Sequence, residues 1–168
     1  MSPSTRDLRV GWWRLNMTFE GSSYVSTTGA LSMPVDRWDA VLPEEMLTRL
    51  TRQHPNILLV GPATFTEAAL RLIEPLVQHP IAWWAPAQKR SVPTGGFATL
   101  FIGGVDAADA EQQSHLCQWF DAYPGRVQVV STAVTPLFPL IQAGGFLDTL
   151  YYRLNHVCVV SDARSADL

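Results

Sequence analysis

NILLVGPATFTEAALRLI, the segment Asn56–Ile73, joins a short apolar run to an amphipathic stretch. Ile57–Val60 is typical of a strand that is buried on both faces. A helix is predicted over Thr66–Gln78, after a turn that contains Gly61 and Pro62. A buried strand followed by a helix is the repeating unit of a parallel α/β sheet, so this segment indicates that class of fold.

The same alternation continues toward the C-terminus. Four more apolar runs predict buried strands: Ile81–Trp84, Thr99–Ile102, Val127–Ser131 and Val157–Val160. Helices are predicted over three further segments, each with a start signal: Pro43–Gln53, Asp109–Ala122 with a capping-box spacing to Gln112, and Thr135–Ala143 with Pro136 in its first turn. We therefore expect a parallel sheet with helices on both faces, in which ligands bind at the carboxyl ends of the strands.

The first part of the chain has a different pattern. Apolar and polar residues alternate over Val10–Glu20, which is the period of a half-buried strand. Gly21–Ser23 interrupts this alternation and Tyr24–Thr27 resumes it, so a β-hairpin is predicted. We expect a β extension over residues 1–40 and an α/β core over residues 41–168, within one compact domain.

Composition excludes several classes of function. The chain has 168 residues, of which 47% are hydrophobic and 16% charged, with a formal net charge of -3 and one lysine, Lys89. This balance predicts a folded, soluble protein without a large nucleic-acid surface or a membrane span. No secretory signal pattern follows Met1, so we expect a cytoplasmic protein. Cys117, Cys158 and the four histidines lack metal-ligand spacing, and neither a metal site nor a cofactor is predicted.

Three segments carry a resemblance to a known family. GGFLDTLYYRLNHV, Gly144–Val157, resembles the G-R-F-R-E-D-L-Y-Y-R-L-N-V signature of sigma-54-dependent bacterial transcription activators, whose ATPase domain belongs to the AAA+ family. ATLFIGGVDAADAEQQSHL, Ala98–Leu116, resembles the stretch around their Walker B motif. Asn56–Ile73 resembles their phosphate-loop strand and helix. The resemblance implies an α/β fold with a P-loop NTPase-like (AAA+) core, a parallel sheet sandwiched by helices.

The phosphate-loop segment departs from the family pattern. Gly61 is followed by Pro62, which has no N–H to donate to a phosphate. Phe65 and Thr66 stand where the family has glycine and lysine, and the loop is one residue short. Gly61, Thr64 and Thr66 are therefore interpreted as a degenerate phosphate loop, equivalent to a simple turn between strand and helix.

The Walker B segment has also lost its carboxylates. The family's magnesium-organising Asp and water-polarising Glu correspond to Gly103 and Gly104, which can neither hold a metal nor accept a proton. Asp106 and Asp109 follow the predicted strand, where they are interpreted as helix-start residues. No catalytic residue is predicted, and the resemblance implies that the chain is not an enzyme.

Other family features are missing too. The sensor Asn corresponds to Val134, and of the two arginines that reach a neighbouring subunit's site, the first corresponds to Leu147 and the second to Arg153. The G-A-F-T-G-A loop that contacts sigma-54 is absent from the interval Trp83–Gly96. The chain ends at Leu168, where the family continues into a helical lid and a DNA-binding domain. The resemblance thus implies a core without a lid, which is not a complete activator.

The first functional hypothesis is a catalytically inactive regulatory module that binds another protein in bacterial transcription. Its partner would be an AAA+ activator or a second copy of itself, because Gly144–Asn155 lies at the subunit interface in the family. The candidate interface residues are Phe146, Tyr151, Tyr152 and Arg153. The tyrosines fit core packing equally well, and Arg153 also fits a purely structural hydrogen-bond donor.

The second hypothesis is a sensor that binds a nucleotide or a cyclic dinucleotide. Trp83 and Trp84 would supply stacking faces, and Lys89 and Arg90 would supply cations. A buried strand followed by a solvated loop explains the same four residues. Unrelated enzyme chemistry has no support, because the serines are not in a nucleophile-elbow pattern.

Overall fold

The computed structural model describes residues 24–27, 32–34 and 44–161. Its strands, in chain order, are β1 (Tyr24–Thr27), β2 (Ser32–Pro34), β3 (Ile57–Val60), β4 (Ile81–Trp84), β5 (Thr99–Ile102), β6 (Gln128–Ala133) and β7 (Val157–Ser161). Its α-helices are α2 (Glu44–Gln53), α3 (Ala63–Ile73), α4 (Ala110–Ala122), α5 (Leu137–Gln142) and α6 (Asp148–Leu154).

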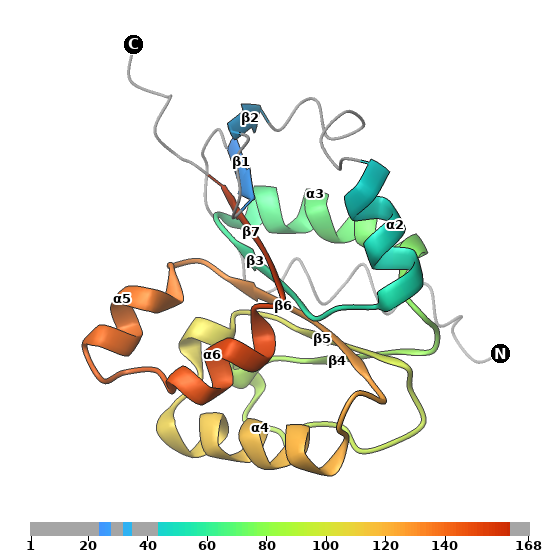
Figure 1. Ribbon diagram of the computed structural model, residues 1–168. Coiled ribbons are helices and arrows are strands. Elements are labelled where there is room, and N and C mark those ends of the chain that lie inside the picture. The colour runs from blue at the N-terminus through green and yellow to red at the C-terminus, as the bar shows by residue number, and fades with distance from the viewer. Residues whose placement is uncertain (1–23, 28–31, 35–43, 162–168) are drawn as a thin grey trace, which may run out of the picture.

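All seven strands form one sheet, in the order β2-β1-β7-β3-β6-β5-β4 (Figure 1). The five strands from β7 to β4 are parallel, with Ile57 of β3 opposite Val130 of β6 and Val157 of β7. β1 is antiparallel to both β7 and β2. The predicted parallel sheet is confirmed, and all five of its strands were expected from apolar runs.

Helices cover both faces of the sheet (Figure 1). Consecutive residues of a strand point to opposite faces, so each central strand contributes to two separate cores. Leu58 and Leu100 pack with residues of α4, α5 and α6 on one face. Leu59 and Phe101 pack with residues of α2 and α3 on the other. Because both faces are covered, the central strands need apolar side chains on both of their sides.

The boundaries of α3 differ from the prediction of Thr66–Gln78. The helix starts earlier, at Ala63, because Pro62 takes the N-cap position with an extended backbone. It ends at Ile73, and a 3-10 turn follows over Glu74–Leu76. Pro75 lies in this turn and has no N–H for the next helical hydrogen bond, which ends the α-helix.

Other elements also differ from expectation. α6 was not predicted as a helix, although Asp148 suits the positive end of a helix at its first position. α5 begins at Leu137 rather than at Thr135. Val10–Glu20 lies outside the described residues, so its strand stays a prediction. Tyr24–Thr27 is a strand as expected, and its pairing with β7 extends the main sheet.

Candidate functional site

The turn between β3 and α3 lies at the carboxyl end of the central strand, where the family binds phosphates. Only Gly61 and Pro62 separate the strand from the helix. The Gly61 N–H donates to the Ala133 carbonyl of β6 at 2.9 Å. A Cβ at Gly61 would stand 2.5 Å from Ser161 Cβ and 2.8 Å from the Phe65 ring. The turn is closed against its neighbours and forms no cradle.

The side chains after this turn face inward. Phe65 is fully buried, and Thr66, which replaces the family's lysine, is 1% exposed. Thr66 Oγ1 donates to the Ala63 carbonyl at 3.1 Å, within its own helix. Thr64 is exposed on α3. The structure thus provides no cation at the lysine position.

Two glycines stand at the end of β5. The Gly103 N–H donates to the Trp84 carbonyl at 2.9 Å, and the Gly104 N–H donates to Thr132 Oγ1 at 3.0 Å. Gly104 has a left-handed backbone with a φ of 64°. Each glycine leaves a metal or a water without the carboxylate that the Walker B motif supplies.

A carboxylate does lie nearby, but it has another role. Asp106 Oδ2 accepts hydrogen bonds from the Val134 N–H at 3.2 Å, the Thr135 N–H at 3.2 Å and Thr135 Oγ1 at 2.9 Å. Asp106 lies in the first turn of a 3-10 helix, Val105–Ala107, as its interpretation as a helix-start residue predicts, and it also joins this segment to the loop after β6. Asp109 is the N-cap of α4 and forms the predicted capping box with Gln112.

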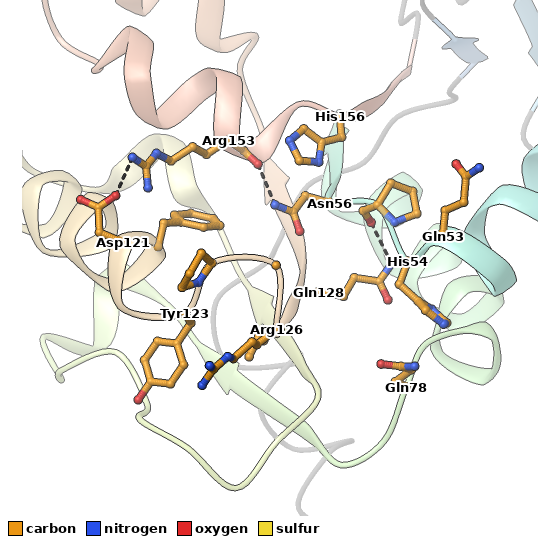
Figure 2. Close-up of a pocket in the computed structure, with 15 residues that line it drawn as sticks. Gln53, His54, Asn56, Gln78, Asp121, Tyr123, Arg126, Gln128, Arg153 and His156 are labelled. Atoms are coloured by element: carbon orange, nitrogen blue, oxygen red, sulfur yellow. Dashed lines mark hydrogen bonds and ion pairs between the residues drawn. The ribbon is translucent and has the colours of Figure 1, made fainter.

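Arg153, in the last turn of α6, belongs to an intramolecular network of contacts. Its Nη2 lies 2.7 Å from Asp121 Oδ1, its Nη1 donates to the Cys117 carbonyl at 3.4 Å, and its guanidinium lies 5.9 Å from the centre of the Phe120 ring. Figure 2 shows the side chain directed at Asp121. These contacts connect α6 to α4 within one chain, so they agree with the structural role considered for Arg153.

The chain has structural neighbours but no match among family models or curated proteins. No family model and no curated protein matches the chain. NtrX from Brucella abortus in complex with ATP has 19% sequence identity and a TM-score of 0.54, over 69% of this chain and 35% of that chain. A further NtrX structure has 18% identity and a TM-score of 0.57, over 71% and 36%. The fold is P-loop NTPase-like.

This assignment confirms the predicted α/β class with a P-loop NTPase-like parallel sheet. A P-loop NTPase domain of a sigma-54 transport activator from E. coli also matches, with 17% identity and a TM-score of 0.44, over 64% of this chain and 97% of that chain. At these identities the similarity establishes the fold and leaves activity open. The chain spans about a third of the length of NtrX.

The P-loop NTPase-like fold places the candidate interface residues in different environments. Phe146 is 4% exposed and belongs to the core, so it cannot contact a partner directly. Tyr151 packs against the same core, and burial is the main cause that raises the pKa of its hydroxyl. Tyr152 is 68% exposed. Of the aromatic residues singled out, only Tyr152 is freely available.

Three further exposed apolar residues were not predicted as surface contacts. They are Val134, Phe138 and Leu147, each more than a third exposed. Phe138 follows the buried Leu137 in α5, and neighbouring helix positions point in different directions. The helical period of residues 137–142 could have indicated an exposed Phe138, whereas Val134 and Leu147 lie in loops without such a signal.

The alternative ligand residues do not form one site. Trp83 packs edge-on against Phe101, with ring centroids 4.3 Å apart, on the α2–α3 face. Trp84 lies on the other face, and its indole N–H donates to the Arg90 carbonyl at 2.7 Å. Trp84 and Arg90 line a pocket of about 430 Å³, which Lys89 does not line. The predicted combination of two stacking faces and two cations is therefore not assembled.

Neither cysteine has a metal-site environment. Cys117 and Cys158 are free, and burial raises the pKa of Cys158 to about 11. Within the described residues, no group of three or more His, Cys, Asp or Glu side chains could hold a metal ion. No helix in the described ranges is long and apolar enough to cross a membrane.

Proposed function

We propose that the chain is a catalytically inactive AAA+-like module that regulates bacterial transcription by binding another protein. The observation that carries this proposal is the β3–α3 turn. A phosphate loop needs free backbone N–H groups around the phosphates. Here Pro62 has no N–H, and that of Gly61 is bonded to the Ala133 carbonyl. This turn is shorter than a phosphate loop, and neither Gly61 nor Pro62 offers a free N–H donor.

The rest of the strand edge supports the same proposal. Phosphoryl transfer depends on charged groups and a metal that stabilise the transition state. Thr66, Gly103 and Gly104 carry no charge, and the nearby Asp106 is held by three hydrogen bonds. Several independent losses at one site favour loss of hydrolysis over a changed substrate.

A surface on the α5–α6 side supports an interaction role. All exposed large hydrophobic residues recorded within the described ranges lie in residues 134–152: Val134, Phe138, Leu147 and Tyr152. We call these four residues the apolar group. A contiguous exposed apolar patch marks a binding surface, and our proposal is that these four side chains contribute to one. The apolar group replaces Phe146 and Tyr151 as our candidate interface.

The proposed partner is an AAA+ subunit or a second copy of this chain. The resemblance implies that the α6 region is a subunit interface in the family, and an inactive subunit placed there would supply no catalytic groups. We therefore expect inhibition of an active partner. Arg153 is occupied by Asp121 of its own chain, so we expect it to stabilise α6 and not to bind the partner.

Sedimentation of purified protein, alone and with an intact AAA+ activator, tests this surface. Tyr152→Glu should weaken association about tenfold, because a charge would be buried at the contact. Thr48→Glu, which adds the same charge to an exposed position of α2, is the matched control and should leave association unchanged.

Failure of the interaction role and failure of its proposed location give different results. A wild-type protein that stays monomeric and does not bind the activator would contradict the interaction role. Equal effects of Tyr152→Glu and Thr48→Glu would contradict the location. Arg153→Glu should lower the melting temperature more than it weakens association.

A further inference from the structure

The connection between α5 and α6, residues 143–147, is mostly exposed to solvent. Its first half is fixed by the backbone itself. The Gly144 N–H donates to the Ile141 carbonyl at 3.0 Å, and the Gly145 N–H donates to the Leu140 carbonyl at 2.8 Å. Gly144 has a left-handed backbone with a φ of 75°, so these two bonds form the glycine cap that is common at helix C-termini. The first half of the connection is therefore a regular end of α5.

The second half is held by one side chain of another helix. Gln113 of α4 is 2% exposed. Its Oε1 accepts from the Leu147 N–H at 2.8 Å, and its Nε2 donates to the Gly145 carbonyl at 3.0 Å and to the Ala108 carbonyl at 2.8 Å. Figure 1 shows the α5–α6 connection beside the N-terminal end of α4. The donor and the acceptor of the amide are both used, so the side chain has one orientation.

The bond to Leu147 compensates for a missing helix cap. Leu147 is the N-cap residue of α6, and a leucine side chain cannot accept a hydrogen bond from the first turn. The N–H groups at the start of a helix have no partner within the helix, and Gln113 supplies one for Leu147 from α4. The Leu147 side chain is 39% exposed. A buried amide therefore fixes the backbone of an exposed apolar residue.

A second member of the apolar group is held in the same way. The Val134 N–H donates to Asp106 Oδ2 at 3.2 Å. Asp106 and Gln113 both belong to the segment 105–113, which contains the 3-10 helix Val105–Ala107 and the first turn of α4. This segment thus fixes Val134 and Leu147, the two members of the apolar group that lie outside helices. Loops that are already fixed lose less conformational entropy when a partner binds.

We propose that Gln113 is a positioning residue for partner binding. It holds Leu147, and the start of α6 that follows it, in the orientation that the partner contacts. This inference rests on the function proposed above and adds the residue that preorganises its surface. Without the bonds of Gln113, Gly145–Leu147 would adopt several conformations, and the partner would have to order them. Gln113 itself is buried and does not touch the partner.

Gln113→Met tests the proposal, because methionine has a similar length and lacks the amide. Sedimentation of the full chain, alone and with an intact AAA+ activator, should show association about tenfold weaker than in the wild type. Gln112→Met is the matched control. Gln112 is the neighbouring residue of α4, and its side chain bonds to the Pro86 carbonyl and the Asp109 N–H. This control should lower stability and leave association unchanged.

Amide hydrogen exchange of the full chain measures the positioning separately from binding. In the wild type, the Leu147 N–H should exchange at least about tenfold more slowly than an unstructured amide, and this measurement does not depend on whether the variants fold. In Gln113→Met, the Leu147 N–H should exchange at least about tenfold faster relative to the Gly145 N–H. The partner of Gly145 is the Leu140 carbonyl, so a general loss of stability affects both amides and cancels in the ratio.

Three results would overturn the proposal. They are a wild-type Leu147 amide that exchanges at the unstructured rate, an exchange ratio unchanged by Gln113→Met, and an association that Gln113→Met and Gln112→Met weaken equally or not at all. A wild-type chain that associates neither with itself nor with the activator would contradict the proposed function, and the binding role of Gln113 with it. The exchange ratio is measured on the chain alone, so it distinguishes that failure from a failure of Gln113 to position the loop.

Discussion

At the carboxyl end of β5, the side chain of Asp106 holds two loops together. Its Oδ2 accepts three hydrogen bonds from Val134 and Thr135. A bond from the Gly104 N–H to Thr132 Oγ1 joins the segment after β5 to strand β6. The Asp106 carboxylate and the Gly104 N–H thus make hydrogen bonds within the chain.

The contribution of Asp106 to stability is measurable. Asp106→Ala should lower the free energy of unfolding by about 1–3 kcal/mol, because charge-assisted hydrogen bonds to two backbone N–H groups are lost. Urea denaturation gives this value. Asp148→Ala is the control, since Asp148 Oδ1 accepts only from the adjacent Thr149 N–H, and its cost should stay below about 1 kcal/mol. Equal losses for the two variants would show that Asp106 does not join the loops.

Residue identity explains which parts of the site could be predicted. The absence of a lysine at Thr66 and of carboxylates at Gly103 and Gly104 is visible in the sequence itself. The buried position of Phe146 is not, because it depends on how α5, α6 and α4 pack. The role of Asp106 was missed for a similar reason, since its partners Val134 and Thr135 are distant in sequence and come close only when β5 and β6 pair.

Among the elements, the β3–α3 connection is the most tightly constrained. Gly61 sits between the end of β7 and the Phe65 ring, and its N–H is bonded to β6. Three strands therefore fix the turn. Opening this turn around a phosphate would require the hydrogen bond between the Gly61 N–H and the Ala133 carbonyl to break.

Substitution of Gly61 tests this constraint. Gly61→Ala should lower the free energy of unfolding by about 3 kcal/mol, because the added Cβ overlaps Ser161 and Phe65. Gly145→Ala is the matched control: its Cβ would lie 3.6 Å from the nearest atom, the Leu140 carbonyl oxygen, and the change should stay within about 0.5 kcal/mol. Thermal or urea unfolding compares the two. A Gly61→Ala variant as stable as Gly145→Ala would show that the turn has room.

Elements differ in how well local sequence determines them. β3 and β5 were predicted with their observed ends, since β3 is apolar throughout, β5 is apolar after Thr99, and a glycine follows each strand. The α3 prediction missed both ends, because Pro62 and Pro75 act on the backbone and not on the apolar period. α6 is too short for a clear helical period. The pairing of β1 with β7 depends on contacts across most of the chain.

At the scale of the whole molecule, the two edges of the parallel sheet have different properties. The carboxyl edge, where ligands are expected in such sheets, is closed by backbone and side-chain hydrogen bonds. The amino edge contains a cavity of about 730 Å³. The missing charged residues at the carboxyl edge could be predicted from the sequence, because these segments resemble the family. The cavity joins residues from three helix ends and three strand starts, which no local pattern brings together.

The most direct test of the inactive-module account is the response of the purified protein to Mg-ATP. Titration with a fluorescent ATP analogue and a phosphate-release assay should show neither binding nor turnover above background, because Thr66, Gly103 and Gly104 carry no charge and the nearby Asp106 is held by three hydrogen bonds. The opposite result would be magnesium-dependent phosphate release that is lost in Thr66→Val, which keeps the side-chain shape but removes the hydroxyl. That result would place an active nucleotide site at the β3–α3 turn and contradict the account.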